Sequence, residues 1–172
     1  VHRLRAVDPG LPAIVATAYT GDEDLAAARQ EGLLAVLPKP LPLQQLLELV
    51  ASAKRGGLVA LVEDDRAMAD NVSELLRQRG FGTVTATSVL ETERLRGVRP
   101  FAALVDLRLP GGVDGEGMAR LDARFPGLPM IVLSGHHDVT PPLPPVARMA
   151  KPFDSAALLE AVEALYVAHV EG

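Results

Sequence analysis

Four short apolar runs in this chain each end in residues that can carry chemistry. The run 58–62 leads into Glu63-Asp64-Asp65, the run 101–105 into Asp106, the run 130–133 into Ser134, and the run 146–150 into Lys151. Each run has the length and the flanking turn residues of a buried strand. The carboxyl ends of parallel strands share one edge of a sheet, where open α/β folds bind ligands. The pattern therefore predicts one site with carboxylates, a hydroxyl and an ammonium group, a set suited to a metal ion and a phosphoryl group.

The chemistry that this set allows follows from its side chains. A carboxylate such as Asp106 can act as a nucleophile and form a covalent acyl phosphate. Neighbouring carboxylates repel one another unless a hard cation binds them, and magnesium uses one or two carboxylates together with water and phosphate oxygens. The ion would neutralise charge on the transferring phosphoryl group. Lys151 would add a point charge, and the Ser134 hydroxyl would donate to a phosphoryl oxygen after transfer.

The composition sets the remaining limits. The 172 residues are 48% hydrophobic, enough for one full domain and part of another. The net charge of -5 gives no electrostatic reason to expect contact with nucleic acid or an anionic membrane. The absence of cysteine excludes disulfides and thiolate metal sites and fits a reducing, cytoplasmic compartment. Because the chain begins with Val1 rather than Met, we expect it to be a fragment of a longer protein.

An internal repeat divides the chain. Segment 11–18 is echoed by 128–135, and segment 39–50 is echoed by 151–162. Residues 1–56 are therefore predicted to hold the C-terminal half of a second module, and 57–168 one complete module followed by a short tail, 169–172. The polar, glycine-rich stretch 54–57 is the predicted junction.

The complete module is expected to alternate strands and helices. The expected strands cover 58–62, 83–86, 101–105, 129–133 and 146–150, and the expected helices cover 66–79, 88–97, 115–124 and a segment from about 155. Gly80 is expected to end the first helix and Asp154 to cap the last. Alternation of this kind predicts an α/β fold with a parallel sheet and helices on both faces. The N-terminal segment would supply strands 13–16 and 33–37 and helices 22–31 and 43–54.

These motifs resemble the receiver domain of bacterial two-component response regulators, which has a flavodoxin-like fold with a five-stranded parallel sheet. The matching sequences are Val62-Glu63-Asp64-Asp65, Asp106-Leu-Arg-Leu-Pro110, Ser134 and Lys151-Pro152-Phe153, each after its strand. One such motif alone is weak. Four in the right order, each at a strand end, make the resemblance specific over residues 57–168.

The resemblance implies a role for each residue. Asp106 would accept a phosphoryl group from a histidine kinase or a phosphotransfer protein. Glu63 and Asp64 would hold Mg²⁺ together with Asp106, and the backbone carbonyl of Arg108 would supply a further oxygen. Ser134 would be the switch hydroxyl and Lys151 the family's invariant lysine. Such a domain assists its own phosphorylation and dephosphorylation, so its status as an enzyme stays open.

The segment between Ser134 and Lys151 departs from the family pattern. It spans 17 positions, whereas the matching interval from Thr17 to Lys39 spans 22. Four prolines between 141 and 145 remove backbone donors and clash with a helical path. We therefore expect the usual fourth helix to be lost or reduced to a loop, with the phosphorylation chemistry retained and the output coupling altered.

Simpler interpretations of the same residues stay open. The acidic run could start a helix, because carboxylates favour helix N-termini, and Asp65 is expected to be solvated rather than a ligand. Ser134 could belong to ordinary turn chemistry, and Lys151 could be a surface side chain. His136 and His137 are expected in a solvated loop rather than at a metal.

Two rival functions also remain. A pseudo-receiver would act only as an interaction module; the acidic residues with Asp106 and Lys151 argue against it, and the lost helix argues for it. A magnesium-dependent phosphatase of the haloacid dehalogenase type also forms an aspartyl phosphate. It would need its nucleophile on the first strand and a second aspartate where Arg108 stands.

The N-terminal half-module, residues 1–56, lacks an acidic pair and a phosphoacceptor of its own. Half a sheet leaves apolar surface and an unpaired edge. We expect it either to pack poorly or to pair with another copy of the chain as a homodimer. The most fitting parent would be a hybrid histidine kinase with tandem receivers.

Overall fold

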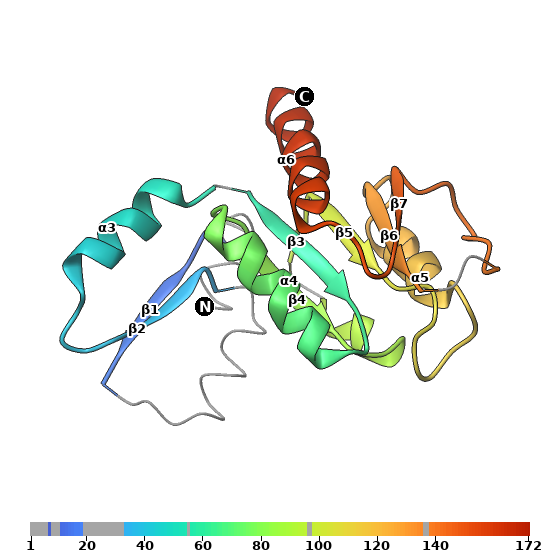
Figure 1. Cartoon of the computed structure of the whole chain (residues 1–172), viewed down its shortest axis with the longest axis horizontal. Coiled ribbons are helices and arrows are strands. Elements are labelled where there is room, and N and C mark those ends of the chain that lie inside the picture. Colours follow the sequence, from blue (N-terminus) through green and yellow to red (C-terminus); the bar gives the residue numbers. More distant parts are fainter. Residues whose placement is uncertain (1–6, 8–10, 19–32, 55, 96–97, 136–137) are drawn as a thin grey trace.

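The computed structural model describes residues 7, 11–18, 33–54, 56–95, 98–135 and 138–172 (Figure 1). Five parallel strands form the main sheet in the order β4-β3-β5-β6-β7. They are β3 (Leu58–Val62), β4 (Gly82–Ala86), β5 (Ala102–Val105), β6 (Met130–Ser134) and β7 (Ala147–Ala150). The predicted α/β fold and all five predicted strands are confirmed, with bounds that differ by about one residue.

The strand order reverses direction at the centre of the sheet. From β3 the chain first adds β4 on one side and then β5 on the other. Such a reversal leaves a crevice at the carboxyl ends of the two central strands, because the connections leave in opposite directions. Residues that follow β3 and β5 therefore lie at the most favourable place for a ligand.

Both faces of the sheet are covered at its three inner strands, β3, β5 and β6, which explains why these strands are apolar at nearly every position. On one face α4 (Arg66–Gln78) and α6 (Ser155–Glu171) pack against alternate strand residues such as Leu61 and Leu104. On the other face α5 (Glu116–Arg124) and a short 3-10 helix, η1 (Leu90–Leu95), pack against Val62 and Val105. Among the described residues, no helix has the length and apolar character needed to cross a bilayer.

Local capping fixes the two helices of the first face. The Asp65 carboxylate accepts a hydrogen bond from the Met68 amide at 3.1 Å and begins α4. Asp65 is exposed, as expected, and the simpler interpretation that the acidic run starts a helix holds for this residue. Gly80 follows α4 with a φ of 83°, and Asp154 caps α6, as predicted.

The predicted helix at 88–97 is wrong in type. The described part forms the 3-10 helix η1. The Glu91 carboxylate accepts hydrogen bonds from the Thr87 amide at 2.8 Å and the Thr87 hydroxyl at 2.7 Å. The Thr92 hydroxyl donates to the Val89 carbonyl at 2.7 Å. Local side-chain bonds of this kind compete with a regular α-helix, which accounts for the tighter turn.

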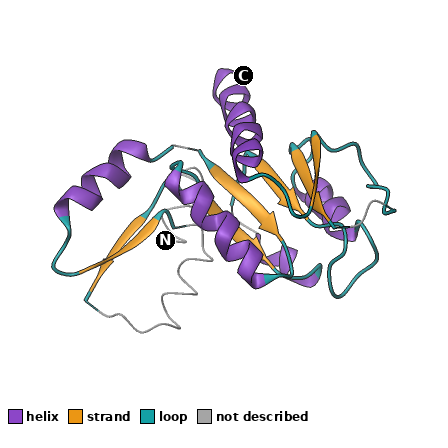
Figure 2. Cartoon of the chain, in the orientation of Figure 1, coloured by secondary structure: helices purple, strands orange, loops and turns teal. Residues whose placement is uncertain are grey.

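The described residues between β6 and β7 form an extended segment instead of a helix. Residues 138–146, the described part of this connection, contain no helix, as the prolines predict (Figure 2). Val139 is buried, and Leu143 packs against the core on the α5 side. A Cβ added to Gly115 would lie 2.7 Å from Pro142 Cδ, so this segment closely contacts the start of α5. His136 and His137 lie outside the described residues.

The N-terminal segment forms a separate two-stranded parallel sheet. Its strands are β1 (Ile14–Thr17) and β2 (Ala35–Pro38), followed by α3 (Leu43–Ser52) (Figure 1). The predicted helix 22–31 lies outside the described residues. At the junction, the Lys54 amide donates to the Gly80 carbonyl at 3.0 Å. The Lys54 ammonium lies 4.6 Å from the centre of the Phe81 ring, a cation–π contact that holds the junction against the complete module.

Candidate functional site

Backbone ladders carry the candidate residues one position beyond their strands. The Glu63 amide donates to the Ala86 carbonyl at 3.0 Å, and the Asp106 amide donates to the Val62 carbonyl at 2.8 Å. The Lys151 amide donates to the Ser134 carbonyl at 3.1 Å. The sheet itself therefore places Glu63, Asp106, Ser134 and Lys151 along one edge.

Lys151 joins two buried carboxylates at this edge. Its ammonium lies 2.6 Å from Glu63 Oε2 and 2.5 Å from Asp106 Oδ2. The Glu63 side chain is 1% exposed, and those of Asp106 and Lys151 are 9% and 16% exposed. Removing one member of a buried ionic group leaves the others uncompensated, so the three residues depend on one another.

The protonation equilibria reflect this burial. Burial raises the pKa of Glu63, and the nearby Asp106 charge adds to the rise, while Lys151 opposes it. Burial alone would lower the pKa of Lys151, but its hydrogen bonds to Asp106 and Glu63 outweigh burial and raise it. Lys151 is therefore charged at neutral pH, and one ammonium faces two carboxylates. The site has a surplus of negative charge.

A third carboxylate completes an acidic cluster. One oxygen from each of Glu63, Asp64 and Asp106 lies within 4.8 Å of the others. Asp64 is exposed, whereas the other two are buried, so the cluster opens to solvent on one side. Hard carboxylate oxygens with room for water are the donor set that Mg²⁺ prefers. The residues present therefore fit a magnesium ion.

Ser134 and Arg108 occupy the positions expected from the sequence. Ser134 ends β6, which lies next to β5, and its side chain is buried. The Arg108 amide donates to Asp106 Oδ1 at 2.9 Å, which fixes the orientation of that carboxylate. The predicted use of the Arg108 carbonyl as a metal ligand stays a prediction. All six candidate residues lie at or just beyond the carboxyl ends of β3, β5, β6 and β7.

The Arg108 side chain has a role that the sequence did not reveal. Its guanidinium pairs with Asp114 at 3.3 Å and with Asp138 at 3.1 Å. These two bonds join the loop before α5 to the extended segment after β6, directly beside the acidic cluster. No local spacing could have indicated this bridge, because Asp138 lies 30 residues away in the chain.

Comparison with known proteins identifies the family. No family model matches the chain. A curated relative from Anaeromyxobacter sp. (strain Fw109-5), named response regulator receiver protein Anae109_2439, is 60% identical over 166 residues. The match covers 96% of this chain and 69% of that relative. The chain belongs to the response regulator receiver family.

More distant relatives agree with this assignment. The transcriptional regulatory protein FixJ of Bradyrhizobium diazoefficiens is 31% identical over 114 residues, which are 62% of this chain and 55% of that protein. The CheY-like receiver domain protein from Methanospirillum hungatei JF-1 has a TM-score of 0.60 at 23% identity, covering 67% of this chain and 98% of that one. The Francisella response regulator 1452 receiver domain has a TM-score of 0.57 at 21% identity, covering 66% and 98%. These two structures bear on the fold alone and confirm it as flavodoxin-like.

The receiver is thus a phosphoacceptor protein of two-component signalling. The haloacid dehalogenase alternative is wrong. Asp106 follows β5, the third strand of the sheet along the chain, and not the first, and Arg108 stands where that class needs an aspartate.

Proposed function

We propose that residues 57–168 form a complete receiver that takes a phosphoryl group onto Asp106 from a histidine kinase or a phosphotransfer protein. The observation that carries the proposal is the buried group of Lys151, Glu63 and Asp106 beside the exposed Asp64. Glu63, Asp64 and Asp106, with the Arg108 carbonyl, would hold Mg²⁺. Bound there, the ion supplies charge neutralisation for the transferring phosphoryl group.

Asp106 provides the nucleophile. One of its carboxylate oxygens forms the bond to phosphorus while the bond between phosphorus and the donor histidine nitrogen breaks, and the freed imidazole keeps that electron pair. The Arg108 amide on Oδ1 limits rotation of the carboxylate and so orients the attack. The low exposure of Asp106 limits the access of competing water.

Lys151 serves the reaction before and after transfer. Before transfer its ammonium pairs with both Glu63 and Asp106 and offsets part of their negative charge. After transfer Asp106 carries the phosphoryl group, and the ammonium gains phosphoryl oxygens as hydrogen-bond acceptors. Ser134, buried at the end of the adjacent strand, would then donate a hydrogen bond from its hydroxyl to a phosphoryl oxygen.

The first test is phosphorylation by acetyl phosphate with and without Mg²⁺, read by intact mass. We expect one added phosphoryl group that requires Mg²⁺ and is absent in Asp106→Asn. Asp70→Asn, an exposed carboxylate on α4, is the matched control and should be phosphorylated normally. A folded protein that takes up no phosphoryl group would refute the proposal and favour the pseudo-receiver, a phosphorylation-independent interaction module.

A further inference from the structure

The N-terminal strand pair repeats the geometry of the last two strands of the complete module. β1 and β2 are parallel and in the same register as β6 and β7. Beyond the strands, the Lys39 amide donates to the Thr17 carbonyl at 2.8 Å, as the Lys151 amide donates to the Ser134 carbonyl at 3.1 Å. Thr17 and Lys39 therefore hold the places of Ser134 and Lys151.

Helix α3 carries the same apolar side chains as α6. When the two Lys-Pro motifs are aligned, Leu46, Leu47 and Val50 match Leu158, Leu159 and Val162. In α6, Leu159 and Val162 are 5% and 0% exposed. In α3, Leu47 and Val50 are 69% and 60% exposed. The face that α6 buries is thus open to solvent on α3.

The complete module shows what covers this face. The core cluster around Leu158 includes Leu76 of α4, Leu61 of β3 and Leu104 of β5. All three elements lie within residues 58–117. The α3 face is therefore matched in residue type to a segment with the element order of β3, α4, β4, η1 and β5.

The repeat locates what the N-terminal module lacks. Residues 1–10 match residues 118–127 at five of ten positions, which are Arg3 and Arg120, Leu4 and Leu121, Ala6 and Ala123, Pro9 and Pro126, and Gly10 and Gly127. The sequence similarity thus begins at the counterpart of Met118. Residues 1–56 thus repeat the module from Met118 onward and contain no counterpart of residues 58–117.

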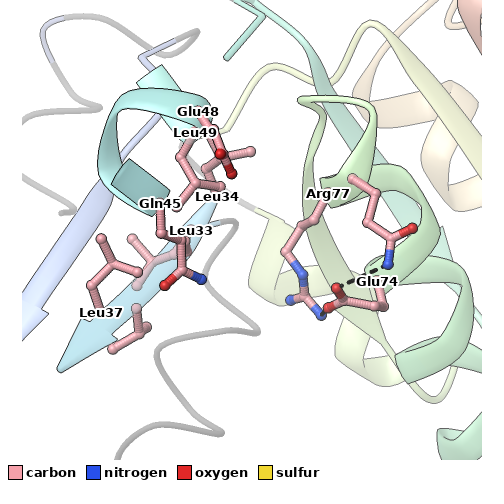
Figure 3. A pocket seen from close by; sticks show the side chains of 11 residues that line it. Leu33, Leu34, Leu37, Gln45, Glu48, Leu49, Glu74 and Arg77 are labelled. Atoms are coloured by element: carbon pink, nitrogen blue, oxygen red, sulfur yellow. Dashed lines mark hydrogen bonds and ion pairs between the residues drawn. The ribbon is translucent and has the colours of Figure 1, made fainter. Parts of the chain in front are cut away.

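Among the described residues, an apolar groove lies beside α3. An apolar groove of about 620 Å³ is lined by Ile14 and Leu34 from the strand side and by Leu46 and Val50 from α3. Across a separate cavity of about 540 Å³, α4 faces the half-module with Glu74 and Arg77, which pair with each other at 3.1 Å (Figure 3). The neighbouring helix thus offers charged groups, not an apolar cover.

We propose that the apolar face of α3 and β1 binds the N-terminal half of another receiver, a segment of the kind formed by residues 58–117, and that the two parts together make a second phosphoacceptor domain. The curated relative is long enough to contain a segment of this kind beyond its matched residues. Its 166 matched residues are 69% of its length, so roughly 75 of its residues lie outside the match, and the segment needs 60. The inference rests on the proposed boundaries of the complete receiver but not on phosphorylation of Asp106.

The test fuses a second copy of residues 58–117 in front of Val1 of the full chain. Hydrogen–deuterium exchange of the α3 amides is then compared between the chain and the fusion. We expect exchange in the fusion to slow about tenfold or more, because α3 joins a packed unit. Leu47→Asp should abolish this protection, whereas Gln44→Asp, an exposed polar position one turn earlier, should leave it intact.

Three results would overturn the proposal. Unchanged α3 exchange in the fusion is the first. The second is an added segment that stays unfolded, since the same residues do fold against α6. The third is a concentration-dependent protection of α3 in the unfused chain, with dimers in light scattering, which would assign the face to a second copy. Phosphorylation of Asp106, measured separately by peptide mapping, tests the proposed function alone and is expected in both proteins.

Discussion

Replacement of Lys151 by methionine tests the physical basis of the site most directly. The substitution keeps the apolar stem of the side chain and removes only its charge and donors. Glu63 and Asp106, at 1% and 9% side-chain exposure, would then face each other without a counter-charge. Because Lys151 pairs with both, a single substitution leaves two buried carboxylates uncompensated.

The expected loss in unfolding free energy is large. Removal of one partner from a buried ionic group costs about 3–5 kcal/mol. We expect about 3–4 kcal/mol at pH 8 without divalent ions, since uptake of a proton by Glu63 relieves part of the cost. Arg148→Met is the matched control. Arg148 lies on β7, the strand that Lys151 follows, and its side chain is exposed, so its loss should change stability by no more than about 1 kcal/mol.

The pH dependence has a defined sign. The folded pKa of Glu63 is already above its ordinary value of 4.5, and removal of Lys151 takes away the main cause that lowers it. An acid with a raised folded pKa binds more protons when folded, so its contribution to stability falls as the pH rises above 4.5. The variant should therefore lose more stability at pH 8 than at pH 5.

Urea unfolding followed by circular dichroism, in buffer with a chelator, measures these differences. A loss below about 1 kcal/mol at pH 8, or a loss equal to that of Arg148→Met, would refute the argument that the three residues form a buried ionic unit. Addition of Mg²⁺ supplies an independent check. The ion should restore part of the stability of Lys151→Met, because it takes the place of the missing positive charge.

Three further outcomes follow from other contacts. Mg²⁺ should raise the Tm of the wild-type protein, because each tenfold increase in its concentration above Kd adds about 1.4 kcal/mol to the unfolding free energy. Asp64→Asn should weaken this effect in a thermal titration. Gly115→Ala should cost about 1–3 kcal/mol in urea unfolding, because the residue has a φ of 81° and an added Cβ would meet Pro142 at 2.7 Å; an unchanged midpoint would contradict this packing. Hydrogen bonds from Thr87 lower the pKa of Glu91. Its stabilising effect is thus present above pH 4.5 and lost as the pH falls through the folded pKa, so Glu91→Gln should destabilise by about 1 kcal/mol at pH 7 and by progressively less as the pH falls below 4.5.

The sequence was sufficient for the sheet and for the convergence of the candidate residues. Strands buried on both faces are apolar throughout, and their carboxyl ends must meet if the strands are parallel. Asp106, Ser134 and Lys151 could therefore be assigned to one edge before any contact was known. The loss of a helix in the proline-rich connection could also be predicted, since four prolines lack the backbone N–H donors that a regular helix needs.

Features that depend on contacts distant in the chain could not be predicted in this way. The bridge from Arg108 to Asp138 depends on where two loops meet after folding. The 3-10 helix η1 depends on side-chain bonds of Thr87 and Glu91 that compete with a helical pattern of similar periodicity. The open face of α3 was expected only as exposed apolar surface; its contrast with the buried face of α6 depends on the side-chain exposures of the folded chain.

The junction at Lys54 has a consequence for how a kinase can dock. Lys54 is bonded to Gly80, just before β4, at the amino ends of the strands, whereas Asp106 follows their carboxyl ends. A five-residue strand such as β3 separates these edges by about 17 Å. A phosphodonor can therefore approach Asp106 at the carboxyl ends of the strands. A segment joined to the receiver through Lys54 lies at their amino ends, away from an incoming kinase.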